Sequence, residues 1–483
     1  MIRTGSLFRV LAAMMTPLLV GAAAAATPSR YSESDEAVYR ARFEQLTTAS
    51  HLGVGLESYE PLEAVPGAQR FRPLPQAGAA ERRISATALA AAREYAERNR
   101  SSALLVWHDG RLEQAAYFGA MKPESTFPSR SLAKPMTAIA VGRAIRLGKI
   151  RSLDQPASDF LTEWRDDPRR SRILVRHLLD MRSGLLPQAV APTAEDILNR
   201  AYLHPRHEEV ILNDYPIVDE PGSRYEYNNA TSEIVALLIE RATGRRYAEF
   251  VGREILAPIG ARGGDVWVNR PAGLAHAGCC MMLPPETWLR LGILLIDDGV
   301  WAGRRLLPLG YVSSMTQGTA QNPYYGLGVY VSGDYIERRG YANPERDVPA
   351  RRVLHSEPYL ARDLFLFDGN ANQVVFIVPS ARLVVLRVGD PPPRANGVEW
   401  DNSVLPNLLL RGLEADRAER GLAPLTPQPR ASVGPDASSR RGGLRRILLQ
   451  RHPASKLGEL AVETSRIFGE RRVAGVRVDA DAR

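Results

Sequence analysis

The spacing of apolar positions divides the chain into a helix and a hairpin, a long helical stretch, and a run of strands. Residues 84–98 are alanine-rich with helical spacing, and the apolar runs 103–108 and 112–118 flank a His-Asp-Gly turn. Asp-Gly supplies the positive φ that a tight hairpin needs. From 138 to about 270 the apolar period is mostly helical, and residues 283–297 predict another helix. Apolar or β-branched runs then predict four strands, at 325–332, 364–367, 374–378 and 383–388.

This order of elements predicts an α+β fold. A hairpin near the start and strands near the end, followed by a helix over 404–417, indicate one antiparallel sheet completed from both ends of the domain. The stretch between them predicts an inserted all-helical subdomain. We expect the sheet to be flanked by helices and the domain to cover residues 84–413.

The N-terminal residues have the pattern of a secretory signal. Arg3 and Arg9 precede the apolar run 10–20, and alanines fill positions 22–26, so we expect cleavage after Ala26. A buried N-terminal helix is the alternative. Residues 27–83 predict an extended arm with a short helix near 35–46. The expected location is therefore periplasmic or secreted.

The net charge of +8 raises the question of nucleic-acid binding. Residues 414–483 hold 14 basic and 9 acidic residues, and the signal segment adds two arginines, so the middle of the chain is nearly neutral. Nucleic-acid binding is therefore not predicted. Residues 414–483 predict a basic, disordered tail that catalysis does not need. A short amphipathic stretch, 444–449, offers an alternative contact with an anionic membrane surface.

Cysteine and histidine usage predicts neither a metal nor another cofactor. Cys279 and Cys280 are adjacent, and two small buried apolar residues are favoured over a vicinal disulfide, which needs a strained ring. The eight histidines are scattered. His204 and His207, in a loop-like His-Pro-Arg-His, are expected to be solvated.

Lys134 stands three residues after Ser131 at a predicted helix start. The chain has only four lysines among its 62 basic residues. Lysine can act as a base when desolvated, whereas arginine keeps its proton. Positions i and i+3 share a helix face, so this pair predicts an activated serine. The alternative is an ordinary helix start with a solvated lysine.

A second motif follows about 90 residues later, at Tyr227-x-Asn229. A phenol can relay a proton between the serine and a leaving group, and an amide can hold the substrate and the lysine. Tyr227 as a core residue and Asn229 as a helix N-cap are the alternatives.

Together these motifs resemble the serine β-lactamase-like hydrolases, which include class C β-lactamases, penicillin-binding D-peptidases and esterases. The shared order is Ser131-x-x-Lys134, then Leu178-Leu179-x-x-x-Ser183-Gly184-Leu185, then Pro221-Gly222 leading to Tyr227-x-Asn229. Residues 278–303, 325–328 and 369–373 are similar to the branch that includes 6-aminohexanoate-dimer hydrolase.

The resemblance implies a role for each motif residue. Ser131 would be the nucleophile, Lys134 the base, Tyr227 the proton relay and Asn229 a substrate contact. The oxyanion hole would combine the Ser131 N–H with a backbone N–H near Asp368-Gly369.

The third β-lactamase motif is absent, because Phe367-Asp368-Gly369 stands where a cation would bind a substrate carboxylate. Asp368 would instead favour an amine or face solvent. We therefore expect an exported serine hydrolase that acts on a small amide or ester through an acyl-enzyme. The alternatives are a cell-wall D-peptidase or β-lactamase, and a non-catalytic binding protein that keeps the fold.

Overall fold

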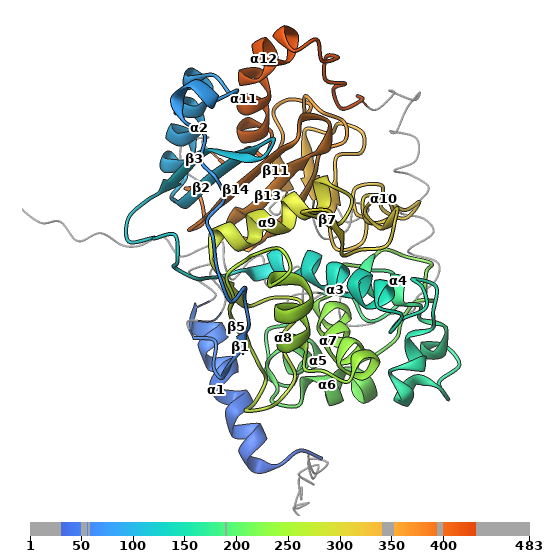
Figure 1. Ribbon diagram of the computed structural model, residues 1–483. Coiled ribbons are helices and arrows are strands. Elements are labelled where there is room, and N and C mark those ends of the chain that lie inside the picture. The colour runs from blue at the N-terminus through green and yellow to red at the C-terminus, as the bar shows by residue number, and fades with distance from the viewer. Residues whose placement is uncertain are drawn as a thin grey trace, which may run out of the picture. The chain divides into compact units, whose positions relative to one another are not determined.

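A six-stranded antiparallel sheet lies at the centre of the computed structural model, which describes residues 30–49, 56, 58–188, 191–340, 352–393 and 399–430 (Figure 1). The strand order is β3-β2-β14-β13-β12-β9. The strands are β2 (Ser101–His108), β3 (Arg111–Tyr117), β9 (Tyr330–Val331), β12 (Phe365–Gly369), β13 (Gln373–Val378) and β14 (Leu383–Gly389). Leu105 of the hairpin pairs with Leu386. The prediction of one antiparallel sheet built from both ends of the domain is confirmed.

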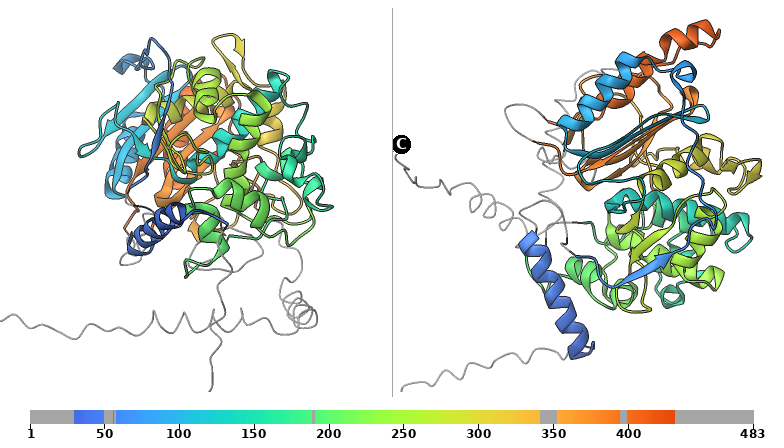
Figure 2. Two further views of the ribbon diagram at one scale, coloured as in Figure 1. Left: turned by 90° about the horizontal axis from the view of Figure 1, so that it is seen from below. Right: turned by 60° about the vertical axis from the view of Figure 1, so that its left-hand side comes forward.

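Helices cover both faces of this sheet. Alternate residues of β2, such as Leu104 and Leu105, point to opposite faces and belong to separate apolar clusters. Helices α2 (Ala86–Arg98) and α11 (Val404–Gly412) cover the Leu104 face together (Figure 2). Helix α9 (Pro285–Ile296) packs on the other face, where Gly292 lies so close to Val384 that an added Cβ would be 2.8 Å from it.

The inserted region contains a second sheet, so the prediction of an all-helical subdomain is wrong. Its order is β1-β5-β6-β4, with strands β1 (Leu62–Val65), β4 (Phe127–Pro128), β5 (Gly264–Trp267) and β6 (Met281–Leu283). Strands of two to four residues are too short to show alternation in the sequence. Strand β1 of this sheet comes from the arm predicted over residues 27–83.

Most of the inserted region is helical, as predicted. Its helices are α3 (Lys134–Arg146), α4 (Val175–Leu179), α5 (Ile197–Leu203), α6 (His207–Glu209), α7 (Asn229–Thr243) and α8 (Tyr247–Val251). The predicted N-terminal helix is α1 (Glu33–Ala49), whose Glu36 forms an ion pair with Arg200 of α5. The remaining elements are β7 (Val300–Trp301), β8 (Arg304–Arg305), α10 (Tyr311–Met315), β10 (Arg338–Gly340), β11 (Arg352–Leu354) and α12 (Glu414–Glu419).

The strand predicted at 325–332 is reduced to β9, because the chain turns sharply before it. Tyr325 forms only an isolated bridge with Tyr330. Gly328 has φ +70°, and a Cβ there would lie 2.8 Å from the carbonyl oxygen of Lys134. Only glycine adopts this conformation readily and allows so close an approach. The turn therefore packs directly on the first residue of α3.

Residues 414–430 pack on the domain, so the predicted boundary of the tail is wrong. Gln428 is 4% exposed, and its Nε2 donates to the carbonyl oxygen of Ser332 at 2.7 Å. Its Oε1 accepts from the backbone N–H of Tyr359 at 3.0 Å. Hydrogen bonds of single polar residues leave no apolar period in a sequence. Residues 431–483, including the amphipathic stretch, lie outside the described residues.

Removing residues 418–483 should therefore destabilise the protein. This truncation leaves the buried Tyr359 N–H without its Gln428 partner, and an unsatisfied group of this kind costs about 1–3 kcal/mol. The Ser332 carbonyl loses its Gln428 donor and keeps the one from Arg339. We expect urea denaturation to show a lower free energy of unfolding. A chain ending at Arg430 keeps both contacts and is the control. Equal stability of the two truncations would contradict the packing of this segment.

In the described part of the chain, no helix combines the length and the apolar character that crossing a membrane requires. The predicted signal segment, residues 1–26, lies outside that part, and export stays a prediction.

Candidate active site

The second sheet fixes the chain immediately before Ser131. The backbone N–H of Ser129 donates to the carbonyl oxygen of Met281 at 3.0 Å, and the Met281 N–H donates to Ser129 Oγ at 3.1 Å. Arg130 then adopts φ +53°, and a 3₁₀ turn, Arg130–Ala133, leads into α3. Ser131 therefore lies one turn before Lys134 at the N-terminal end of a helix, as predicted.

Lys134 and Tyr227 both contact the hydroxyl of Ser131. Lys134 Nζ lies 3.0 Å from Ser131 Oγ, and the Tyr227 hydroxyl lies 2.8 Å from it. Lys134 Nζ also donates to Asn229 Oδ1 and to the carbonyl oxygen of Gly278, both at 2.9 Å. Lys134 is 2% exposed, so it is not the solvated lysine of the alternative interpretation. The structure brings together four residues that the sequence singled out.

The acceptors around Lys134 suit an amine that removes a proton from Ser131. Asn229 Oδ1 and the Gly278 carbonyl can only accept hydrogen bonds. A neutral amine has two N–H bonds and one lone pair. When the two oxygens take both N–H bonds, the lone pair is left for the third neighbour, the Ser131 hydroxyl.

Asn229 is available for this contact because its neighbour caps the helix. Asn228 is the N-cap residue of α7, and its Oδ1 accepts from the Thr231 N–H at 3.3 Å. Asn229 is the first helical residue, and its Oδ1 accepts from Lys134 Nζ. The N-cap interpretation of Asn229 is therefore wrong by one residue.

The Leu-Leu-x-x-x-Ser-Gly-Leu segment holds the chain that carries Tyr227. The Glu226 N–H donates to the carbonyl oxygen of Met181 at 2.9 Å. Ser183 Oγ lies 2.9 Å from Thr231 Oγ1 in α7. The Tyr227 ring packs beside the apolar cluster on the Leu104 face of the six-stranded sheet. The centroid of the ring lies 4.9 Å from Lys134 Nζ. The segment thus supports the site and does not itself contact Ser131.

Gly369 lies beside the Ser131 turn, whereas Asp368 does not join the contacts of Ser131. A Cβ at Gly369 would lie 2.9 Å from both Leu132 N and the carbonyl oxygen of Ser129, so only glycine fits there. Because side chains alternate along β12, Asp368 points to the opposite face. Its electrostatic neighbours there are Tyr330 and Tyr359. The predicted role of Asp368 in substrate binding stays a prediction.

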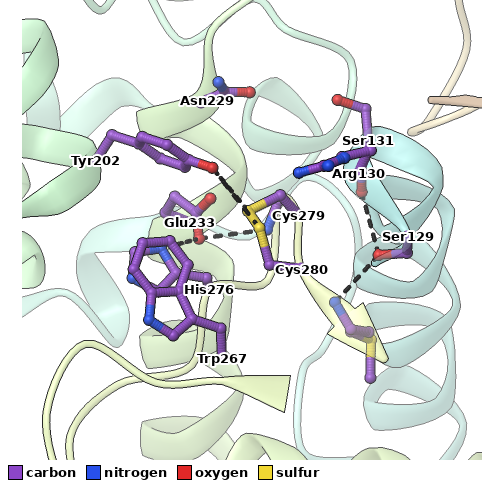
Figure 3. The surroundings of a disulfide bond; sticks show 12 residues. Ser129, Arg130, Ser131, Tyr202, Asn229, Glu233, Trp267, His276, Cys279 and Cys280 are labelled. Atoms are coloured by element: carbon purple, nitrogen blue, oxygen red, sulfur yellow. Dashed lines mark hydrogen bonds and ion pairs between the residues drawn. A yellow bond between two sulfur atoms is a disulfide. The ribbon is translucent and has the colours of Figure 1, made fainter. Parts of the chain in front are cut away.

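Cys279 and Cys280 form a disulfide, so the prediction of two unlinked cysteines is wrong (Figure 3). Their predicted burial is confirmed, at 7% and 0% exposure. Cys280 has φ +69°, a left-handed conformation that the sequence alone does not reveal for a non-glycine residue. The disulfide directly follows Gly278, whose carbonyl holds Lys134.

Glu233 is a buried acid behind Lys134 that the sequence interpretation missed. Its Oε2 accepts from the Gly278 N–H at 3.3 Å, and its side chain is 0% exposed. Burial raises the pKa of Glu233 to about 8, while the charge of Lys134 opposes the shift. The carboxyl group is therefore mostly protonated at neutral pH. The sequence feature that could have indicated this buried acid is a charged residue on an apolar face of the helix 229–243.

His207, Glu233 and His276 form a buried cluster whose possible ligand atoms lie within 4.8 Å of one another. His276 stacks on Trp267 at 3.5 Å between centroids and on His207 at 4.3 Å. Ring stacking uses the faces of the imidazoles and not their in-plane nitrogens, and His276 Nδ1 lies 3.6 Å from Glu233 Oε2. The three side chains form a buried polar cluster that packs against Trp267.

The prediction of solvated histidines is wrong. His204 and His207 are both fully buried, and burial lowers the pKa of each to about 4. His204 Nδ1 accepts from the Arg206 N–H at 3.0 Å, which closes the turn between α5 and α6. The loop-like sequence concealed this packing, because the neighbours of both rings come from distant segments such as α1.

The family profile named Beta-lactamase matches residues 86–389. The chain therefore belongs to the beta-lactamase family, within the serine hydrolase superfamily, and the predicted resemblance is confirmed. The match covers most of the domain predicted for residues 84–413.

Relatives in this family carry several hydrolase names. The chain is 27% identical to esterase EstB of Burkholderia gladioli over 237 residues, which cover 45% of this chain and 57% of that protein. It is 23% identical to 6-aminohexanoate-dimer hydrolase of Paenarthrobacter ureafaciens over 287 residues, which cover 56% of this chain and 72% of that protein. A D-aminopeptidase of Brucella canis is 27% identical over 160 residues, which cover 33% of this chain and 30% of that protein. The names of these relatives support the assignment of this chain as a hydrolase.

Solved structures support the same fold. A Bacillus anthracis protein assigned as a 6-aminohexanoate-dimer hydrolase superposes with a TM-score of 0.57 at 18% identity, covering 79% of this chain and 95% of that one. A Bacteroides dorei protein assigned as a β-lactamase superposes with a TM-score of 0.51 at 18% identity. The superposition covers 69% of this chain and 98% of that one. The predicted α+β fold of β-lactamase type is confirmed.

Proposed function

We propose that the protein is an exported serine hydrolase that cleaves a small amide or ester through an acyl-enzyme. The observation that carries this proposal is the position of Ser131 Oγ, between Lys134 Nζ at 3.0 Å and the Tyr227 hydroxyl at 2.8 Å. Ser131 is the nucleophile, Lys134 the general base and Tyr227 the proton relay. No metal or other cofactor takes part in this scheme.

In the first half of the reaction, Lys134 removes the Ser131 hydroxyl proton as Oγ attacks the substrate carbonyl carbon. The Ser131 N–H and a backbone N–H near Gly369 stabilise the oxyanion, helped by the helix N-terminus. Tyr227 gives its proton to the leaving amine or alcohol, and Lys134 returns a proton to Tyr227. Water then attacks the acyl-enzyme by the same relay in reverse order and frees Ser131.

The same residues would serve a D-peptidase or β-lactamase, which is the nearest alternative. β12 argues against it, since Phe367 and Asp368 occupy the place where the third motif has a cation. The substrate carboxylate of a β-lactam would find no positive charge on that strand. Neutral esters and amides do not need one.

We therefore expect nitrocefin to be a poor substrate compared with short-chain p-nitrophenyl esters. A missing charge-assisted hydrogen bond typically costs about 1.5–3 kcal/mol, or roughly 10- to 150-fold. The measurement is kcat/KM for nitrocefin, for p-nitrophenyl acetate and butyrate, and for 6-aminohexanoate oligomers. Ser131→Ala measured in parallel reports uncatalysed hydrolysis. A higher kcat/KM for nitrocefin would favour the β-lactamase alternative.

A non-catalytic binding protein is the second alternative. The contacts between Ser131, Lys134 and Tyr227 argue against it, because a scaffold has no need to keep a buried lysine beside a serine hydroxyl. We propose no nucleic-acid partner, since the domain is nearly neutral.

A further inference from the structure

We infer that Arg130 is a specificity-determining residue that binds a carboxylate on the substrate, an inference that rests on the proposed function. The substrate class is an ester or amide with a free carboxylate near the scissile bond. Arg130 directly precedes Ser131, and its φ of +53° is a conformation that only a few per cent of non-glycine residues adopt. Its guanidinium is thus placed by the same turn that places the nucleophile.

The guanidinium of Arg130 has no anionic partner among the described residues. It donates no hydrogen bond there, and its carbon Cζ lies 5.3 Å from the centroid of the Tyr59 ring. Burial lowers the pKa of Arg130, and only Tyr202 opposes this shift. Other buried arginines of the domain have hydrogen-bond acceptors: Glu254 for Arg143, Glu286 for Arg290, and backbone carbonyls for Arg42 and Arg387.

The guanidinium lies on the side of Ser131 where the Gly278–Cys280 turn passes. Figure 3 shows the Arg130 side chain extending from the Ser131 backbone toward Cys279. Tyr202, the electrostatic neighbour of Arg130, contacts Cys279 Sγ at 3.3 Å. Gly278, one residue earlier, accepts from Lys134 Nζ. Arg130 therefore lies near the groups that surround the reacting hydroxyl.

A half-buried cation that has no anionic partner among the described residues favours an anionic ligand at this place. Its five N–H groups are already partly desolvated, so a carboxylate would gain paired hydrogen bonds with little further loss of hydration. Arg130 precedes Ser131 and does not stand on β12, so this carboxylate is not the one that the third β-lactamase motif would bind.

The test compares two esters of similar length in four proteins. The esters are mono-p-nitrophenyl glutarate, which carries a carboxylate, and neutral p-nitrophenyl pentanoate. The proteins are the wild type, Arg130→Gln, Arg130→Lys, and the control Arg98→Gln, which removes an exposed arginine. The readout is the ratio of kcat/KM for the anionic ester to that for the neutral ester.

We expect Arg130→Gln to lower this ratio about tenfold or more, the factor that a charge-assisted hydrogen bond contributes. Arg130→Lys should keep part of the preference, and Arg98→Gln should keep all of it. Glutarate should inhibit the wild type more strongly than Arg130→Gln. Melting temperature and labelling of Ser131 by a fluorophosphonate show that the variants are folded.

An unchanged ratio in Arg130→Gln would overturn the inference alone. If both kcat/KM values fell equally, Arg130 would only shape the turn. If the wild type cleaves neither ester and Ser131 is not labelled, the proposed function fails and the inference fails with it. Cleavage of the neutral ester alone leaves the proposed function intact and contradicts the carboxylate site.

Discussion

Replacing Ser131 by alanine abolishes covalent labelling by a fluorophosphonate probe and lowers kcat by at least about 10³-fold, if Ser131 is the nucleophile. The variant loses the oxygen that both Lys134 Nζ and the Tyr227 hydroxyl contact. Residues that act as a unit lose most chemical catalysis when one of them is removed. Labelling is read on a gel, and kcat is measured with p-nitrophenyl butyrate.

The matched control is Ser313→Ala in α10, an exposed serine. It should leave both labelling and turnover at wild-type levels. Circular dichroism of both variants tests that the fold is kept. Undiminished turnover in Ser131→Ala would end the nucleophile assignment. Absence of labelling and turnover in the wild type as well would favour the non-catalytic alternative.

Local sequence patterns predicted the parts of the fold that depend on neighbouring residues. The Asp109-Gly110 turn and its flanking apolar runs give β2 and β3. Ser131 and Lys134 meet because three residues of a helical turn separate them. The pairing of β2 with β14 followed from the order of elements, which allows few other ways to complete an antiparallel sheet.

The sequence did not reveal contacts between short segments that are distant along the chain. Strand β1 pairs with β5 across about 200 residues, and neither strand exceeds four residues. Lys134 Nζ also donates a hydrogen bond to the backbone carbonyl of Gly278. A backbone acceptor cannot be predicted from a motif of side chains. Gln428 is buried by hydrogen bonds to distant backbone groups in the same way.

The motif placed Asp368 next to Gly369, and Gly369 does lie against the Ser131 turn. One position along a strand reverses the direction of the side chain, so the contacts of Asp368 do not follow from its place in the motif. The structure brings Ser131, Lys134, Tyr227 and Asn229 together, and the substrate contact of Asp368 stays a prediction.

Lys134→Arg should be nearly inactive although it keeps the positive charge. General acid–base catalysis typically contributes about 10²–10⁴-fold, and an arginine cannot lose the proton that a base must exchange. The planar guanidinium is also too large for the buried position in which one nitrogen meets Ser131 Oγ, Asn229 Oδ1 and the Gly278 carbonyl. We expect kcat for p-nitrophenyl butyrate to decrease by a factor within that range.

The control is Lys149→Arg, an exposed lysine just after α3, which should have wild-type kcat. Because a larger side chain can disturb a buried site, the melting temperature of both variants and a third variant, Lys134→Met, are needed. Lys134→Met has neither charge nor base and should be as inactive as Lys134→Arg. If Lys134→Arg kept wild-type kcat while Lys134→Met lost it, the charge alone would matter. Lys134 would then be a structural cation, and another group would have to take the proton of Ser131.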